Sequence, residues 1–237
     1  MIFIAVASGF ATAQAVKGTV KSDPAGEKFA AVRALADRTV KAHGGSKLKA
    51  MGTLVIAGSV DVTMSGVPQA IPATFITIFA GDKYRIEINN PFQPLKQAFD
   101  GVTTSSTIRG GFMLPPLNRL GFPLLARIGD TGFIVTELPA EKRKRKGFRV
   151  TSPEGFLTDF YLDEKTDQIK AYDANYVIEG RTVTTSVEID KFRIVEGIVV
   201  PEKYVQRFDM EQMTVYANFK AKEITVNTVV PNTLFTV

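Results

Sequence analysis

The sequence predicts a mainly β protein of the α+β class, an incomplete antiparallel β-barrel of about eleven strands. From Thr53 onward, strand-length runs alternate with turn residues such as Asp100-Gly101 and Glu196-Gly197. Only residues 23–45 form a long stretch with helical spacing. A second apolar stretch, Phe112–Gly129, is interrupted by proline and glycine. We expect the sheet to wrap around the helix and this broken segment, and to enclose a hydrophobic cavity.

Residues 1–15 resemble a signal peptide. They are uncharged and apolar through Phe10 and end in Ala13-Gln14-Ala15, which fits an A-x-A cleavage site. The positively charged start of such a peptide is missing, and the alternative is a short buried N-terminal strand. We expect cleavage after Ala15, export to the periplasm, and one domain over residues 16–237. Because the chain has no Cys, the mature protein would have neither a lipid anchor nor a disulfide.

The composition fits one soluble globular domain. A chain of 237 residues with 45% hydrophobic and 22% charged residues can bury a substantial core. Outside residues 1–15 there is no uninterrupted apolar run of about eighteen residues, so no transmembrane helix is predicted.

The N-terminal helix is predicted from its ends as well as its period. Asp23 is a favoured N-cap, and Pro24 suits the first helical position. The helix ends at His43-Gly44-Gly45, where a glycine can adopt the left-handed conformation that closes a helix. A second short helical turn is predicted around Ser46–Met51, with Ser46 as its cap.

Strands are predicted for most of the remaining chain, and no helical period separates them, which favours consecutive antiparallel pairing. Their ranges are 53–64, 71–80, 83–89, 96–99, 103–109, 132–138, 148–151, 156–162, 169–178, 181–195, 199–210 and 213–226.

Alternation along two of these strands predicts the cavity wall. Tyr84, Ile86 and Ile88 alternate with polar residues in the third strand. Val215 and Phe219 belong to a similar apolar set in the last strand. Because successive side chains of a strand point to opposite faces, we expect these five to point inward and contact a ligand.

The segment Phe112–Gly129 is too apolar to lie in water and too often broken to form a long helix. We call it the lid segment and expect short helical turns that cover the cavity. Its predicted ligand-contacting residues are Phe112, Leu117, Leu120 and Leu124. The alternative is a permanent plug that completes the core.

A basic run, Lys142-Arg143-Lys144-Arg145-Lys146, contributes much of the net charge of +5. Its turn-forming neighbours place it at a hairpin tip. It is interpreted as a solvated turn or as a contact for anionic lipid or a partner. Nucleic-acid binding is not predicted, because aromatic residues are not interleaved with the basic ones.

No catalytic, metal or cofactor site is predicted. The single histidine, His43, follows a helix and suits a capping or surface position better than a general base. Without Cys, a zinc site would be almost all carboxylate. The acidic pairs Glu154/Asp159 and Glu188/Asp190 could form a glycosidase pair, but solvated strand positions explain them more simply.

Several segments carry a family resemblance, namely Ala42-His43-Gly44-Gly45, residues 150–155, residues 160–166, residues 192–201 and residues 230–235. Together, across most of the mature chain, they resemble the periplasmic lipoprotein-sorting proteins of the LolA/LolB-like superfamily. The resemblance implies a half-barrel closed by helices over a cavity for acyl chains, with an inner-membrane donor protein and an outer-membrane acceptor protein as partners.

We therefore predict a non-catalytic periplasmic carrier or chaperone that shields the acyl chains of lipoproteins or another lipid during transfer toward the outer membrane. Its contact with a membrane would be transient. The alternative is a structural or interaction module whose core is permanently closed.

Overall fold

The computed structural model describes residues 24–66, 69–92, 94–107, 114, 116–178, 181–210 and 213–236. The predicted signal peptide (residues 1–15), the predicted cap Asp23 and the predicted ligand contact Phe112 lie outside the described residues.

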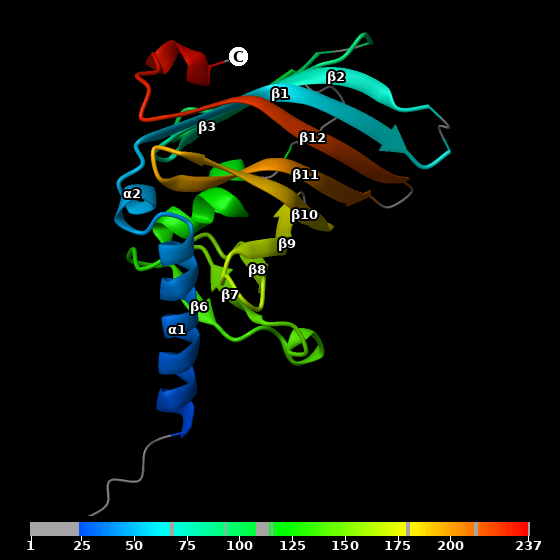
Figure 1. Cartoon of the computed structure of the whole chain (residues 1–237). Coiled ribbons are helices and arrows are strands. Elements are labelled where there is room, and N and C mark those ends of the chain that lie inside the picture. The colour runs from blue at the N-terminus through cyan, green and yellow to red at the C-terminus, as the bar shows by residue number, and fades with distance from the viewer. Residues whose placement is uncertain are drawn as a thin grey trace, which may run out of the picture.

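A single antiparallel sheet dominates the fold (Figure 1). In the part of the chain that is described it has twelve strands in the order β5-β4-β3-β2-β1-β12-β11-β10-β9-β8-β7-β6. Strands that are consecutive in sequence pair with each other, apart from β5 and β6, which do not pair. In addition, β1 pairs with β12, which joins the two halves of the sheet. The strands are β1 (Thr53–Met64), β2 (Ile71–Ala80), β3 (Lys83–Asn89), β4 (Leu95–Phe99), β5 (Thr104–Ser106), β6 (Ile134–Thr136), β7 (Gly147–Thr151), β8 (Leu157–Leu162), β9 (Ile169–Ile178), β10 (Arg181–Val195), β11 (Ile198–Met210) and β12 (Met213–Val226).

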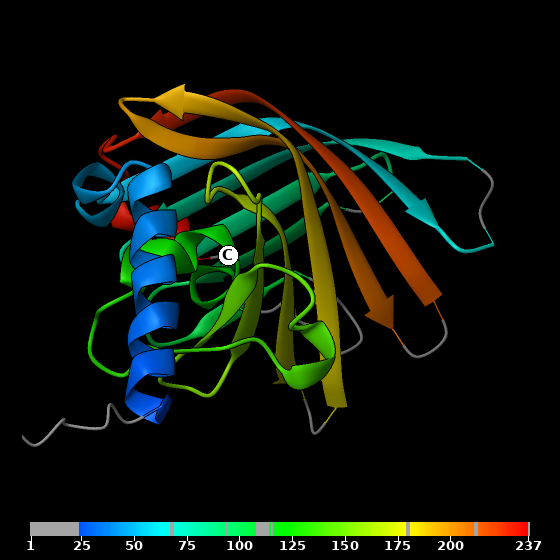
Figure 2. The ribbon, with the colours of Figure 1, turned by 60° about the horizontal axis from the view of Figure 1, so that its bottom comes forward.

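The sheet curves strongly but does not close, which confirms the incomplete barrel (Figure 2). Its two edges, β5 and β6, are only three residues long each, and short edge strands limit pairing with other chains. Because β5 and β6 are consecutive in sequence, the connection between them runs from one edge of the sheet to the other. The lid segment belongs to this connection.

Two helices precede the sheet, as predicted: α1 (Pro24–Ala42) and α2 (Ser46–Lys49). Gly44 and Gly45 separate them with φ of 118° and 57°, the left-handed region that ends a helix. The prediction of Ser46 as a cap is wrong, because Gly45 occupies the cap position of α2 and no side chain bonds there. Helix α1 contacts β6 and β7 (Figure 1).

His43 is not a surface residue, because its side chain is fully buried, and it does not cap the helix, because both of its ring nitrogens bond to strands. Its Nδ1 lies 2.9 Å from the carbonyl oxygen of Val199, and its Nε2 accepts a hydrogen bond of 3.0 Å from the backbone N–H of Ile169. Nδ1 therefore carries the proton, and the neutral ring joins the end of α1 to β9 and β11. With both ring nitrogens engaged, His43 is not available as a base. Burial lowers its pKa.

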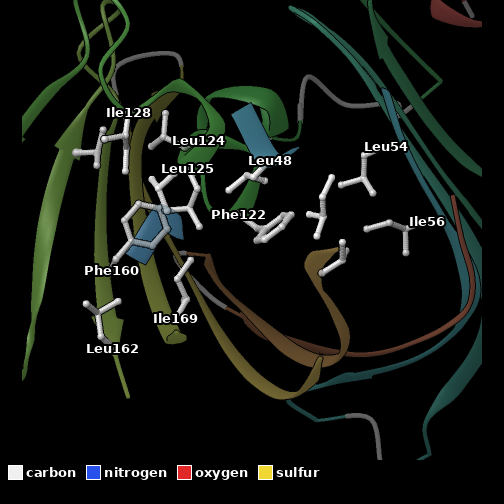
Figure 3. Packing of buried hydrophobic residues seen from close by; sticks show 14 of the residues in the cluster. Leu48, Leu54, Ile56, Phe122, Leu124, Leu125, Ile128, Phe160, Leu162 and Ile169 are labelled. Carbon is white, nitrogen blue, oxygen red and sulfur yellow. The ribbon is translucent and has the colours of Figure 1, made fainter. Parts of the chain in front are cut away.

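The lid segment forms two short 3₁₀ turns, η1 (Leu117–Arg119) and η2 (Phe122–Arg127), in agreement with the broken helical pattern. Phe122, Leu124 and Leu125 of η2 are buried in the main core. Figure 3 shows Phe122 between Leu54 and Ile56 of β1 on one side and the residues from β8 and β9 on the other. The lid segment therefore fills the middle of the half-barrel.

Candidate functional site

An apolar cavity lies between the lid segment and the concave face of the sheet. Its volume is about 90 Å³. One wall, from β1, β2 and β3, consists of Leu54, Ile56, Thr77, Phe79 and Ile86. The lid segment contributes Leu117, Leu120, Phe122 and Pro123.

The opposite wall comes from β9, β10 and β11 and is more polar, and Phe219 of β12 lies between the two walls. The residues of this wall are Tyr172, Thr185, Val187, Ile189, Pro201, Tyr204 and Gln206. No charged side chain lines the cavity within the described residues. The cavity can therefore accept an uncharged, largely apolar group.

Four of the predicted ligand contacts line the cavity, namely Ile86, Leu117, Leu120 and Phe219. Tyr84 and Leu124 are buried in the core instead of lining it. The Tyr84 hydroxyl accepts a hydrogen bond of 2.7 Å from Gln97.

The other predicted contacts lie farther from the cavity. Ile88 is half-buried and packs against the core, and Val215 is half-buried on β12 without lining the cavity.

The lid segment contacts the polar wall closely at Gly121. A Cβ atom built on this residue would collide with the ring and hydroxyl of Tyr172, and φ of Gly121 is +63°. Only glycine satisfies both conditions without strain. The backbone of the lid segment thus lies directly against the hydroxyl end of Tyr172.

Polar contacts hold the outer side of the lid segment to the turn between β2 and β3. The carboxylate of Asp82 accepts hydrogen bonds from Arg119 at 3.0 Å and from Arg127 at 2.6 Å. The Asn118 side chain also donates to the backbone carbonyl of Asp82, at 2.6 Å. The hydrogen bond from Arg127 lowers the pKa of Asp82, so the carboxylate stays charged near neutral pH. We call Asp82, Asn118, Arg119 and Arg127 the rim latch.

Two further contacts support the same segment. Arg119 forms an ion pair of 3.1 Å with Glu154 in the turn between β7 and β8. Lys49 of α2 donates to the carbonyl of Ile128, and burial lowers the pKa of Lys49. The lid segment is thus attached to three separate parts of the fold by polar groups at its surface.

Two lysines of the basic run are held by carboxylates, although the sequence suggested a solvated turn. Lys142 donates to Asp159 at 2.8 Å and to Asp173 at 2.9 Å, and Lys146 is 2.8 Å from Asp167.

Arg143 pairs with Glu137 at 3.3 Å, and the Arg145 guanidinium stacks over Tyr161. Lys144 is exposed and has no partner among the described residues. An open groove on this side is lined by five basic residues, Lys144, Arg145, Lys146, Lys165 and Lys170, and by three acidic ones, Asp163, Glu164 and Glu188.

Asp159 is not a solvated strand residue, because its side chain is completely buried. Arg149 binds it through two hydrogen bonds of 2.6 and 2.9 Å, and Lys142 provides a third. Its expected partner Glu154 is exposed and pairs with Arg119 instead. The two carboxylates therefore do not form a glycosidase pair, and Asp159 belongs to an ion-pair network.

Sequence reasoning missed the rim latch and the polar wall. Asp82 follows Gly81 in a turn, where an acidic residue is commonplace, and its partners lie 37 and 45 positions away. Tyr172 and Tyr204 lie in strands that were predicted correctly. The alternation of side chains along each strand was the available signal, because it places both tyrosine rings on the face that points inward.

The described part of the chain offers neither a membrane span nor a metal site. None of its helices is long and apolar enough to span a membrane. No group of three or more His, Asp or Glu side chains in the described ranges could hold a metal ion.

Comparison with solved structures identifies the fold. A LolA superfamily protein from Nitrosomonas europaea matches with a TM-score of 0.53 and 8% identity, covering 87% of this chain and 97% of that one. A DUF1329 family protein from Desulfovibrio piger matches with a TM-score of 0.47 and 9% identity, covering 86% of this chain and 96% of that one. An outer-membrane lipoprotein-sorting protein domain from Vibrio parahaemolyticus matches with a TM-score of 0.43 and 9% identity, covering 84% of this chain and 97% of that one. No family model and no curated protein matches the sequence. The first likeness shows that the chain shares the fold of that LolA superfamily protein.

Proposed function

We propose that this protein is a periplasmic carrier that shields acyl chains, of lipoproteins or of another lipid, in the cavity beneath the lid segment, without making or breaking bonds. The domain over residues 16–237 would remain after removal of residues 1–15. Transfer would proceed from an inner-membrane donor protein toward an outer-membrane acceptor protein. The LolA superfamily fold is compatible with this role, but the proposal is based on the cavity.

The absence of charge from the cavity carries this proposal. None of its described lining residues is ionisable near neutral pH, and both walls and the lid segment contribute large apolar side chains. An acyl chain there would lose contact with water without leaving a buried charge unpaired. Ile86, Leu117, Leu120 and Phe219 would contact the chain directly.

The cavity is smaller than its proposed cargo, which implies movement. Its volume of about 90 Å³ is below the range of roughly 300–1,000 Å³ that is typical for pockets that hold a drug-sized ligand. Loading would therefore displace the lid segment. An acyl chain could take the place of Leu120 and Phe122 against the sheet, so apolar packing on the sheet would be preserved when the lid segment moves away.

The rim latch would then set how readily the lid segment moves. Its ion pairs lie at the surface, with the Asp82 side chain 52% exposed, so each contributes little in free energy. Weak surface contacts can be broken and remade on loading. We propose that the latch holds the lid segment over the empty cavity but allows lipid to enter.

Membrane contact would involve the exposed part of the basic run. Lys144 and the groove residues Lys165 and Lys170 remain available for anionic headgroups, whereas Lys142 and Lys146 are held in ion pairs. Near an anionic surface each available cation contributes about 1 kcal/mol. We expect salt-sensitive co-sedimentation with anionic liposomes. Replacing Lys144, Lys165 and Lys170 by Gln should abolish it, and binding that persists in the variant or at high salt would contradict this role.

The function is tested by native mass spectrometry of the gently purified protein and by uptake of a fluorescent fatty acid. We expect a co-purifying lipid mass or saturable uptake. Hydrogen exchange in residues 116–129 should be faster than in β1 and β12, and should change on loading. A ligand-free mass, no uptake, and slow exchange that is indifferent to lipid would instead support a structural module with a permanently closed core.

A further inference from the structure

The cavity is polar on one side only. Of its described residues on β1, β2 and β3, Thr77 alone is polar. The wall from β9, β10 and β11 carries Tyr172, Thr185, Tyr204 and Gln206. A cavity that held hydrocarbon alone would gain nothing from this arrangement, because each polar group loses water when an apolar ligand covers it.

These polar residues form one cluster by strand register. Tyr172 is opposite Val187, which is opposite Gln206 on the next strand, so Tyr172 and Gln206 share a row across the sheet. Tyr204 is two positions from Gln206 on the same face of β11. The Tyr204 ring is fixed by stacking on Phe219, with centroids 4.7 Å apart. The hydroxyl groups are thus held by rigid strands and not by loops.

The two tyrosine hydroxyls have hydrogen-bonding capacity to spare. Neither Tyr172 nor Tyr204 has a hydrogen-bond partner among the described residues, although both rings line the cavity. Gln206 donates from its amide to Thr185 at 3.0 Å, and Thr185 donates to the Arg207 carbonyl at 2.9 Å. Burial raises the pKa of both phenols, so they remain neutral donors.

We propose that Tyr172 and Tyr204 recognise the carbonyl oxygen of an ester- or amide-linked acyl chain, which places the linkage against the β9–β11 wall and the hydrocarbon against β1–β3. This inference rests on the proposed function and adds the chemical class of the ligand. A neutral carbonyl accepts hydrogen bonds from neutral hydroxyls, and it brings no charge into a cavity that has no counter-ion. Tyr172 lies beneath Gly121, so displacement of the lid segment would expose its hydroxyl to the incoming ligand.

The test compares three probes with equal numbers of heavy atoms: methyl decanoate (an ester), N-methyldecanamide (an amide) and tridecane (an alkane). Their dissociation constants are measured by displacement of N-phenyl-1-naphthylamine from the full chain, in the wild type and in the Tyr172→Phe and Tyr204→Phe variants. Tyr176→Phe is the matched control. It lies on the same strand as Tyr172, and its buried hydroxyl has no partner among the described residues, but it does not line the cavity.

We expect each cavity variant to weaken binding of the ester, the amide or both by about 3- to 10-fold, the usual effect of one hydrogen bond, and to leave tridecane unchanged. The probe whose binding weakens, the ester or the amide, identifies the linkage. Tyr176→Phe should change none of the three constants. Equal effects on all three probes, or no effect on any, would overturn the carbonyl assignment while tridecane binding still supported the carrier. Failure of the wild type to bind any probe would remove the carrier proposal as well.

Discussion

Substitution of Gly121 by Ala tests how tightly the lid segment packs on the sheet. Ala at this position meets two separate penalties. Its φ of +63° is unfavourable for a residue with a Cβ, at about 1–2 kcal/mol. The new methyl group would also overlap the Tyr172 ring, and a forced rearrangement of this kind costs about 1–3 kcal/mol. We expect Gly121→Ala to lower the free energy of unfolding by about 2–5 kcal/mol in total.

Gly81→Ala and Gly66→Ala separate the two penalties. Gly81 has φ of +58° and Gly66 has φ of +85°, and a Cβ on either meets no atom within 4 Å. Both controls should therefore lose only the backbone part, about 1–2 kcal/mol. Gly66 serves as a second control because Gly81→Ala could disturb the neighbouring Asp82. It lies in the turn after β1, far along the chain from the lid segment.

The measurement is urea denaturation followed by circular dichroism, combined with hydrogen exchange in η1 and η2. Tyr172→Leu should recover part of the loss in the Gly121→Ala background, because the smaller side chain makes room for the methyl group. If Gly121→Ala were no more destabilising than Gly81→Ala, and Tyr172→Leu recovered nothing, the close packing of lid segment and wall would be refuted.

Three further predictions concern the rim latch, the buried histidine and the cavity wall. Asp82→Asn should weaken the latch by about 1 kcal/mol after allowance for exposure and speed exchange in η1 and η2 about fivefold. Asp61→Asn loses only the 3.7 Å surface pair with Lys220 and should leave exchange in η1 and η2 unchanged. Equal exchange in the two variants would count against the latch. Because burial lowers the pKa of His43, the unfolded chain binds its proton first as pH falls. The free energy of unfolding should therefore be unaffected by His43 above about pH 6.5 and decline below it, by at most about 1.4 kcal/mol per pH unit. His43→Gln should remove this decline in urea titrations between pH 7 and 5, and an unchanged slope would show that another group is responsible. Ile86→Asp should lose several kcal/mol of stability and most lipid uptake, because its carboxylate would be buried without a partner. Ile86→Val should lose only about 0.5–1.5 kcal/mol, and normal melting and uptake in the Asp variant would show that Ile86 does not face the cavity.

The sheet could be predicted from the sequence because its signals are local. Strict alternation along β3 and β12 identified the buried face of each strand, which carries Ile86 in β3 and Phe219 in β12. Turn residues marked the hairpins. The breaks at Gly121 and Pro123 likewise indicated short turns in the lid segment. Each of these inferences uses residues within one or two turns of each other, where spacing alone decides the geometry.

What escaped prediction depends on pairing between distant segments. His43 at a helix end looked like a surface residue, and its buried position depends on carbonyl and amide groups of β11 and β9, which are 156 and 126 positions away. Lys142 looked like part of a solvated run for the same reason, since Asp159 and Asp173 reach it only through the pairing of β8 with β9. Composition and local period carry no information about such contacts.

The lid segment is held by two kinds of contact, and they should respond differently to lipid. Its inner side, with Leu120 and Phe122, makes apolar contacts that an acyl chain can replace almost without net change in buried apolar surface. Its outer side is held by Arg119 and Arg127 on Asp82, and those hydrogen bonds must break while lipid enters but can re-form afterwards. The rim latch should therefore govern the rate of loading, and the cavity wall should govern how much lipid is bound at equilibrium. It follows that Asp82→Asn should speed fluorescent fatty-acid uptake more than it changes the amount bound, and that Ile86→Asp should reduce the amount bound. If both variants changed rate and capacity alike, the lid segment and the wall would not be separate elements.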